Sequence, residues 1–305
     1  MISLTIEDRL QATQKTRLQK LQNAHSLLFV PANQQKFIHS SIKRNADIVV
    51  LDLEDSIPTT DKPASRNTLQ QHVNFLLQHS VQIAVRINQD LLNAAEDLRA
   101  AVIFGVDVIM VPKTLGANHL QLLDATISEL ELQQGLEPGT IKLIAMIETL
   151  GGLEQLNSLV HATPRLSALA MGSEDLSLDG GFEANTENLF YPAQQITLAA
   201  KRAGLLAYGF PGSIAQYSNT EQFTEQQHKG KSMGFSGALC IHPTQVDIVN
   251  RIYAVSENDI AEAKAIIDAY ENALYQHQGA ISVNGKMVDA PVVERARKIL
   301  ETSEQ

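Results

Sequence analysis

The stretch ADIVVLDLEDSIP, residues 46–58, indicates how the chain folds. It starts as a continuous apolar, β-branched run, which is typical of a strand covered on both faces in a parallel sheet. The run ends in three carboxylates, Asp52, Glu54 and Asp55, and a segment of helical period follows at Asp61–His79. A buried strand, a polar loop and an amphipathic helix in this order form the repeating unit of an α/β protein.

The same unit recurs along the chain. Further amphipathic segments lie at Leu91–Phe104, His119–Leu130 and Ala193–Ala203. Eight units in series favour closure into a TIM (β/α)8 barrel over an open sheet. The first strand leads into VPANQQ rather than GxGxxG, which argues against a dinucleotide-binding fold. We expect strands at His25–Val30, Asp47–Leu53, Gln82–Ile87, Val106–Val111, Lys142–Ile147, Leu166–Met171, Leu205–Tyr208 and Gly237–Ile241.

The length of 305 residues suits one barrel with a C-terminal addition. We expect the barrel to occupy residues 1–255 and the extension to occupy residues 256–305. In the extension, a long helix from about Glu257 to His277 precedes the extended segment ISVNGKMVD, and a last helix starts near Pro291. Such helices are not needed to close a barrel, so we expect them to dock on their own subunit or on a neighbouring one.

The composition excludes several classes of protein. The 34 acidic residues outnumber the 24 basic ones, which argues against a nucleic-acid-binding face. The single cysteine, Cys240, excludes an internal disulfide and a cysteine-based zinc site, and it fits a reducing, cytoplasmic setting. The first 25 residues are polar and helix-like and lack the apolar core of a signal peptide. No run of 18 apolar residues occurs, so we expect no transmembrane span.

Carboxylates stand at the ends of two neighbouring strands. Glu148 closes LIAMIE, and Asp175 follows one strand later in MGSEDL. In a barrel, the carboxyl ends of the strands form the catalytic face. Mg²⁺ or Mn²⁺ is suited to one or two protein carboxylates, with places left for water and substrate oxygens. We therefore expect Glu148 and Asp175 to bind a metal and, through it, the substrate; a helix cap or a salt bridge is the alternative for each.

Arg86 ends the third strand, in AVRIN. A guanidinium there is always charged and can hold a carboxylate or an enolate oxygen. The alternative is an internal salt bridge to Asp52 or Glu54, and both can hold because such a pair would orient the arginine. We expect Asp52, Glu54 and Asp55 to support the site and its loops rather than to contact the metal.

Three other residues raise weaker possibilities. Lys113, in VPK, could form a Schiff base as in some aldolases, but a metal site makes this unnecessary. His242 could be a metal ligand, yet the nine histidines show no HxH or HExxH grouping, so packing is favoured. Cys240 lies within a strand and is expected to be a small core residue.

An ordered series of motifs runs through nearly the whole chain. The motifs are SLLFVPAN, ADIVVLDLEDSIP with KPASR, VRIN, DVIMVPK, IAMIETLGGL, MGSEDLSLDGG, AAKRAGL, GFSGALCIHPTQ and NGKMVDAP. As a series they are far more specific than any one of them. In this series the chain resembles the citrate lyase beta subunit and its relatives, the malyl-CoA and citramalyl-CoA lyases of the HpcH/HpaI aldolase superfamily.

The resemblance implies a reaction and a set of roles. The enzyme would be a carbon–carbon lyase or synthase for a 2-oxo or 3-hydroxy acid or its CoA thioester, with an enolate intermediate. Glu148 and Asp175 would bind Mg²⁺, and Arg86 would contact the substrate carbonyl or enolate oxygen. Asp289, in GKMVD, would be a general acid/base delivered from the neighbouring subunit of a homotrimer.

The chain also departs from the family pattern. Relatives commonly carry arginine at the positions of His25 and Ala193, and lysine at the position of Ala238. They commonly carry glycine at Ala32 and aspartate at Gly209. We expect the missing basic groups to be ones that meet the substrate or the phosphates of coenzyme A or that brace the mouth of the barrel.

Two other functions therefore stay open. One is a pyruvate- or glyoxylate-type aldolase that acts on a free acid without CoA, which the missing basic groups favour. The other is a catalytically degenerate barrel that serves as a subunit or binding module. Retention of Arg86, Glu148 and Asp175 together counts against the second alternative.

Overall fold

The computed structural model describes residues 17, 19–275 and 279–303. The polar N-terminal segment, residues 1–16, and the expected end of the long helix at His277 lie outside these residues. The chain divides into two compact units, residues 1–253 and residues 254–305.

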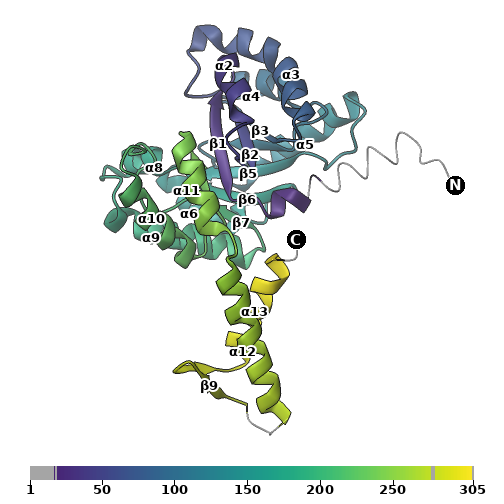
Figure 1. Ribbon diagram of the computed structural model, residues 1–305. Coiled ribbons are helices and arrows are strands. Elements are labelled where there is room, and N and C mark those ends of the chain that lie inside the picture. Colours follow the sequence, from purple (N-terminus) through teal and green to yellow (C-terminus); the bar gives the residue numbers. More distant parts are fainter. Residues whose placement is uncertain (1–16, 18, 276–278, 304–305) are drawn as a thin grey trace, which may run out of the picture. The chain divides into compact units, whose positions relative to one another are not determined.

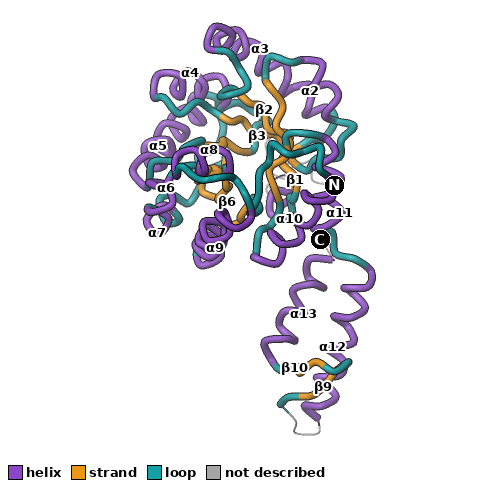
Figure 2. Tube along the Cα trace, turned by 90° about the vertical axis from the view of Figure 1, so that its left-hand side faces the viewer, coloured by secondary structure: helices purple, strands orange, loops and turns teal. Residues whose placement is uncertain are grey.

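Eight parallel strands form the centre of the first unit, with helices around them (Figure 2). Their order is β7-β6-β5-β4-β3-β2-β1-β8, and β7 meets β8 through a parallel bridge between Tyr208 and Gly237. The Gly209 N–H also donates to the Gly237 carbonyl oxygen at 2.9 Å, so the sheet closes on itself. The expected (β/α)8 barrel is confirmed. The strands are β1 Ser26–Pro31, β2 Ile48–Asp52, β3 Gln82–Arg86, β4 Val108–Val111, β5 Lys142–Ile147, β6 Leu166–Met171, β7 Leu206–Tyr208 and β8 Ala238–Cys240.

Helices follow the strands along the chain (Figure 1). The amphipathic segments expected from the sequence correspond to α3, α4, α5 and α9. Among the described residues, none of the helices combines the length and the hydrophobicity needed to cross a membrane. The helices of the first unit are α2 Gln35–Ser41, α3 Lys62–Gln78 after the 3-10 turn η1 Thr59–Asp61, α4 Leu91–Ala101, α5 Ala117–Gln133, α6 Leu150–Glu154, α7 Leu156–Leu159, α8 Ser173–Gly180, α9 Thr186–Arg202, α10 Thr220–Met233 and α11 Pro243–Tyr253.

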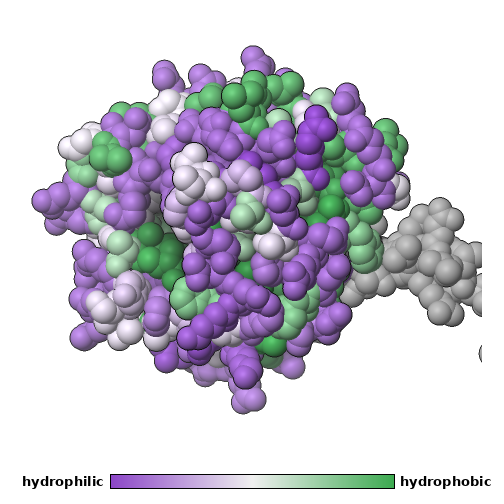
Figure 3. Space-filling model, turned by 90° about the horizontal axis from the view of Figure 1, so that it is seen from above, coloured by the Kyte–Doolittle hydropathy of each residue, from purple (hydrophilic) through white to green (hydrophobic). Residues whose placement is uncertain are grey.

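Two hydrophobic clusters explain why the strands read as continuous apolar runs. Ile48 and Val50 belong to a smaller cluster, which fills the inside of the barrel and takes every second residue of a strand. Val49 and Leu51, from the same strand, belong to the larger cluster that also includes the apolar faces of the helices. Each such side chain contributes about 1.5–3 kcal/mol when fully buried. Hydrophilic side chains cover most of the surface seen in Figure 3.

The second unit is a helix, a β-hairpin and a helix. These are α12 Glu257–Tyr275, β9 Ile281–Val283, β10 Lys286–Val288 and α13 Ala290–Ser303. Asn284 and Gly285 form the hairpin turn with φ of 51° and 76°, as a two-residue turn with both residues left-handed requires. The elements agree with those expected for the extension. Its docking on a neighbouring subunit stays a prediction.

Candidate active site

A cavity of about 440 Å³ lies at the carboxyl ends of the strands, within the first unit. Polar side chains line one part of it and apolar side chains another, which suits a substrate with a charged head and an apolar body. The polar lining consists of Asp52, Asp55, Ser56, Arg86, Glu148, Ser173, Glu174 and Asp175. The apolar lining includes Phe29, Pro31, Met146, Met171, Phe210, Ile214, Leu239 and Ile241.

Arg86 is held in place by the neighbouring strand. It pairs in register with Asp52, the last residue of β2, and donates from Nε and Nη2 to the two Asp52 oxygens at 2.7 Å each. Its Nη1 lies 3.0 Å from Glu54 Oε2, and its Cζ lies 4.8 Å from the centre of the Phe29 ring. The salt bridge weighed against a substrate-binding role therefore exists, and it orients the guanidinium beside the cavity.

Burial and neighbouring charges shift the pKa values of Asp52, Arg86 and Glu54. Burial alone would raise the pKa of Asp52, but the hydrogen bonds and the charge of Arg86 hold that pKa below its ordinary value. Burial opposes the charged form of Arg86 as well, yet Asp52 and Glu54 raise its pKa above the ordinary value. For Glu54, burial outweighs the attraction of Arg86 and Lys113, so its pKa is raised.

Glu148 follows β5 and is buried at the edge of the cavity. It accepts the Lys113 main-chain N–H at 2.7 Å. A Cβ atom at Gly172 would overlap the Glu148 side chain and lie 2.5 Å from its Cγ, which explains the glycine before SEDL. Burial raises the pKa of Glu148 to about 7, helped by the nearby charges of Glu54 and Asp175 and opposed by the Lys113 N–H.

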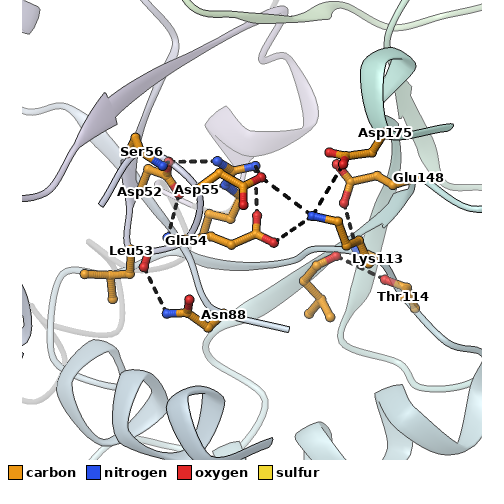
Figure 4. Close-up of polar contacts among 12 residues, drawn as sticks. Asp52, Leu53, Glu54, Asp55, Ser56, Asn88, Lys113, Thr114, Glu148 and Asp175 are labelled. Carbon is orange, nitrogen blue, oxygen red and sulfur yellow. Dashed lines mark hydrogen bonds and ion pairs between the residues drawn. The ribbon is translucent and has the colours of Figure 1, made fainter. Parts of the chain in front are cut away.

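Asp175 lies in the first turn of α8 rather than in a loop, and its side chain is 32% exposed. Figure 4 shows its carboxylate beside that of Glu148; Asp175 faces the Lys113 ammonium, and Glu148 faces the Lys113 main-chain N–H. The two residues expected to bind a metal thus line the same cavity from consecutive βα units, Glu148 directly after β5 and Asp175 at the start of α8.

Lys113 makes contacts that the sequence reasoning missed. Its ammonium lies 3.1 Å from Glu54 Oε1 and 3.6 Å from both Asp55 Oδ2 and Asp175 Oδ1. Burial would lower the pKa of Lys113, but Glu54, Glu148 and Asp175 raise it above the ordinary value. A Schiff-base lysine needs a lowered pKa, so this environment argues against that alternative.

The donor set fits Mg²⁺ better than a transition metal. Among the described residues no group of three or more histidines, cysteines and acidic residues is placed to hold a metal ion. Glu148 and Asp175 offer two carboxylates facing a cavity. Mg²⁺ is commonly bound by one or two carboxylates and retains water at its other positions.

Residues 25–243 match the family described as HpcH/HpaI aldolase/citrate lyase. The chain belongs to this family. It is 33% identical over 279 residues to the citrate lyase subunit beta of Haemophilus influenzae, covering 90% of this chain and 95% of that one. It is 27% identical to the L-malyl-CoA/beta-methylmalyl-CoA lyase of Cereibacter sphaeroides, covering 91% and 93%.

A solved structure has the same architecture. The crystal structure of protein CitE from Mycobacterium tuberculosis, in complex with magnesium, acetoacetate and coenzyme A, matches with a TM-score of 0.73 and 26% identity. The match covers 93% of this chain and 99% of that chain, so it extends well beyond residues 25–243.

Asp289 belongs to the second unit. It directly precedes α13, and its Oδ1 accepts the Val292 N–H at 3.3 Å. This is the helix-capping arrangement that was the alternative to catalysis. A cap and a catalytic role are compatible, and the catalytic role stays a prediction.

Three of the departures from the family pattern do not lie at the mouth, and our expectation for them is wrong. His25 precedes β1, and its Nδ1 lies 2.6 Å from the Ser236 carbonyl oxygen, at the amino ends of the strands. Ala238 begins β8 and is fully buried in the larger cluster, as is Ala193 of α9. His25 and Ala238 lie at the amino ends of their strands, and Ala193 is buried on α9; none of the three lines the cavity, whereas Gly209 does.

Two further residues have the packing roles expected of them. The His242 ring stacks on Tyr217, with ring centres 4.8 Å apart, and its Nδ1 lies 2.8 Å from Thr244 Oγ1. Cys240 is fully buried in the larger cluster. Sequence reasoning also missed Phe29, whose ring faces the Arg86 guanidinium; its place on an apolar strand gave no sign of this contact.

Proposed function

We propose that this protein is a Mg²⁺-dependent carbon–carbon lyase, or synthase, that acts on a 2-oxo or 3-hydroxy acid or its CoA thioester through an enolate. One observation carries the proposal. Two carboxylates, Glu148 and Asp175, and a fixed guanidinium, Arg86, line one cavity of a barrel in this family. The relatives named as lyases, and the related structure that contains magnesium, acetoacetate and coenzyme A, support it.

Glu148 and Asp175 would hold the metal, Mg²⁺ or alternatively Mn²⁺. Bound there, the ion supplies Lewis-acid polarisation and a template for the carboxylate and neighbouring oxygen of the acid. The burial of Glu148 and the close fit of Gly172 against it restrict where this carboxylate can go. The substrate would therefore be oriented by a rigid group.

Arg86 would stabilise the negative charge that develops on the enolate oxygen. Asp52 accepts from Nε and Nη2 and keeps the guanidinium in one plane. An arginine has five N–H donors, so this pair leaves donors free for the substrate. A pre-oriented cation costs little reorganisation when the charge appears.

Asp289 would move the proton as general acid/base, delivered from the neighbouring subunit of a homotrimer. Its position next to a hairpin in a separate compact unit supports this part of the proposal. The residues that line the cavity described above lie between Phe29 and Ile241, within the first unit. A proton-transferring aspartate from elsewhere would complete the set of roles.

The positions of His25, Ala193 and Ala238 weaken the argument for a free acid as the substrate. The free-acid alternative rested on neutral or titratable residues at His25, Ala193 and Ala238, and these lie away from the cavity. A CoA thioester is therefore our preferred substrate. Gly209 is the departure that lines the cavity, and it keeps the choice of acid open.

The experiment that tests this function is a condensation screen. Acetyl-CoA or propionyl-CoA is incubated with glyoxylate or pyruvate, with Mg²⁺ or with chelator, and products are identified by mass spectrometry. We expect a hydroxyacyl-CoA that forms only with the metal. Metal-dependent cleavage of a free hydroxy acid without any CoA product would favour the free-acid aldolase. No turnover together with no Mg²⁺ binding would favour the degenerate barrel.

A further inference from the structure

Lys113 reaches both proposed metal-binding carboxylates, one with its main chain and one with its side chain. Its N–H donates to Glu148 Oε2 at 2.7 Å, and its Nζ lies 3.6 Å from Asp175 Oδ1. The same ammonium lies 3.1 Å from Glu54 Oε1 and 3.6 Å from Asp55 Oδ2. Figure 4 shows it between the two groups of carboxylates.

The backbone at Lys113 adopts an uncommon conformation that serves the first contact. Its φ is 42°, in the left-handed region that residues other than glycine rarely occupy. The turn is held by the next residue, because the Thr114 N–H donates to the Met146 carbonyl oxygen at 3.2 Å and Thr114 Oγ1 donates to the Val111 carbonyl oxygen at 3.1 Å. This turn directs the Lys113 N–H at Glu148.

The second contact places a protein cation beside one of the proposed metal ligands. A dication bound to Asp175 and an ammonium 3.6 Å from the same carboxylate would repel each other. Glu54 lies closer to the ammonium than Asp175 does, and Asp55 lies at the same distance as Asp175. The lysine therefore has other acidic partners once Asp175 is engaged.

We propose that Lys113 is a positioning residue that sets the metal affinity of the site: its N–H orients Glu148, and its ammonium competes with Mg²⁺ for Asp175 and moves onto Glu54 and Asp55 when the metal binds. This inference rests on the proposed metal site. The ammonium neutralises a crowded set of carboxylates in the absence of metal and keeps metal binding reversible.

Competition predicts opposite shifts in two variants. In Lys113→Met the competitor is gone, while the side-chain length and the backbone preference are retained. The dissociation constant for Mg²⁺ should therefore fall by about threefold to fivefold, the range expected for one partly exposed ion pair. In Glu54→Gln the ammonium loses its nearest alternative partner and stays on Asp175. Here the dissociation constant should rise by a similar factor.

The double variant separates competition from the simple loss of a charge. Glu54→Gln also removes a negative charge near the metal, and that part of its effect does not depend on Lys113. In the Lys113→Met background, the rise caused by Glu54→Gln should therefore be smaller than in the wild type. Both shifts should diminish as potassium chloride is added, because salt screens partly exposed charges.

Calorimetric titration of the full chain with MgCl₂ at fixed pH tests the proposal. Lys113→Arg should stay near the wild-type dissociation constant. Lys201→Met, which removes a lysine of α9 that does not line the cavity, is the matched control and should do the same. If Lys113→Met does not fold, Lys113→Gln and the Mg²⁺-dependent rise in Tm replace it.

The sign of the change decides the outcome. A lysine that only holds the carboxylates together would, when replaced, leave the dissociation constant unchanged or raise it, and either result overturns the proposal. A wild-type chain that binds no Mg²⁺ overturns the proposed function as well. Normal wild-type binding without tighter binding in Lys113→Met overturns this inference alone.

Discussion

The two ends of the barrel both carry buried charges, but they arrange them differently. At the amino ends of the strands, Arg165 donates to Glu131 from Nη2 at 2.6 Å and from Nη1 at 3.0 Å, and it also pairs with Asp124. Glu131 further accepts the N–H groups of Gly139 and Ile141. Each of these charges has several partners, which is the pattern of a structural network.

At the mouth, by contrast, carboxylates outnumber cations. Arg86 pairs with Asp52 and also lies beside Glu54. The Lys113 ammonium is shared by Glu54, Asp55 and Asp175, and buried Glu148 accepts a main-chain N–H. An excess of acidic groups around a cavity stabilises a bound cation and destabilises the fold without one. The comparison indicates that one end of the barrel is built for stability and the other for a cation and an anionic substrate.

The largest expected effect concerns activity at the mouth. Arg86→Ala should lower kcat by about 10²–10³-fold, because a pre-oriented charge on the developing enolate is lost. Asp289→Ala should also be inactive if the aspartate transfers the proton. Steady-state kinetics of the condensation or cleavage reaction measures both.

Mixing these two variants tests whether they act across subunits. If Asp289 is delivered from a neighbour, a hybrid oligomer contains some sites with both residues intact, and activity should return in part. Oligomers shown by mass spectrometry to be mixed, yet without any recovery, would mean that Asp289 acts in its own subunit or has no catalytic role.

At the opposite end, Arg165→Met should lower the free energy of unfolding by about 3–5 kcal/mol, because the buried Glu131 carboxylate would lose its cation and keep only main-chain N–H donors. Chemical denaturation measures this change. Arg202→Met, which removes an exposed arginine bonded to Asn157, is the matched control and should cost about 0.5 kcal/mol or less. The Mg²⁺ affinity of the folded Arg165→Met protein should stay unchanged. A lower affinity would show that the amino end of the barrel also contributes to metal binding.

A smaller effect is the pH dependence of metal binding. Glu148 has a pKa of about 7 and must lose its proton to bind Mg²⁺, so affinity should rise from pH 6 to pH 8 by about tenfold or less. Calorimetry in two buffers of different ionisation enthalpy should detect release of up to about one proton at pH 6. Affinity that is constant over this range would contradict the assignment of Glu148.

The same pKa has a consequence for stability. Its folded-state value is raised from 4.5, so the contribution of Glu148 to the metal-free fold is fully present below about pH 4.5 and is lost as the pH rises through about 7. Mg²⁺ should offset this loss. The metal-dependent increase in Tm should therefore be larger at pH 8 than at pH 6.

The smallest expected effect is none at all. Borohydride added with substrate should leave the mass of the protein unchanged, because the carboxylates around Lys113 keep it protonated and poorly nucleophilic. An adduct on Lys113 in the mass spectrum would show a Schiff-base aldolase instead.

The sequence sufficed for the strands because each is buried on both faces, and the expected ends agree with the structure to within two residues. It also indicated the acidic rim, since the ends of parallel strands in a barrel meet on one side. Our expectation for His25 and Ala238 came from the resemblance and not from the direction of the strands. Because His25 precedes β1 and Ala238 begins β8, both lie at the amino ends of the strands, opposite the mouth.

Side-chain partners were the other limit. The pattern VPK gave no sign that the Lys113 backbone is left-handed or that its ammonium joins Glu54 to Asp175. Those contacts depend on how far the ends of β2 and β4 and the start of α8 are displaced along the barrel axis relative to one another, which a single motif does not encode. In contrast, a salt bridge of Arg86 to Asp52 or Glu54 was an open alternative in the sequence, and the structure has Arg86 beside both carboxylates.

Titration of the metal-free chain with MgCl₂ at pH 8 measures the proposed metal site itself. We expect the wild type to bind one Mg²⁺ per chain, and we expect Glu148→Gln and Asp175→Asn each to abolish the binding heat. Both variants should retain the circular dichroism spectrum of the wild type. Undiminished binding in both folded variants would show that Glu148 and Asp175 are not the metal ligands.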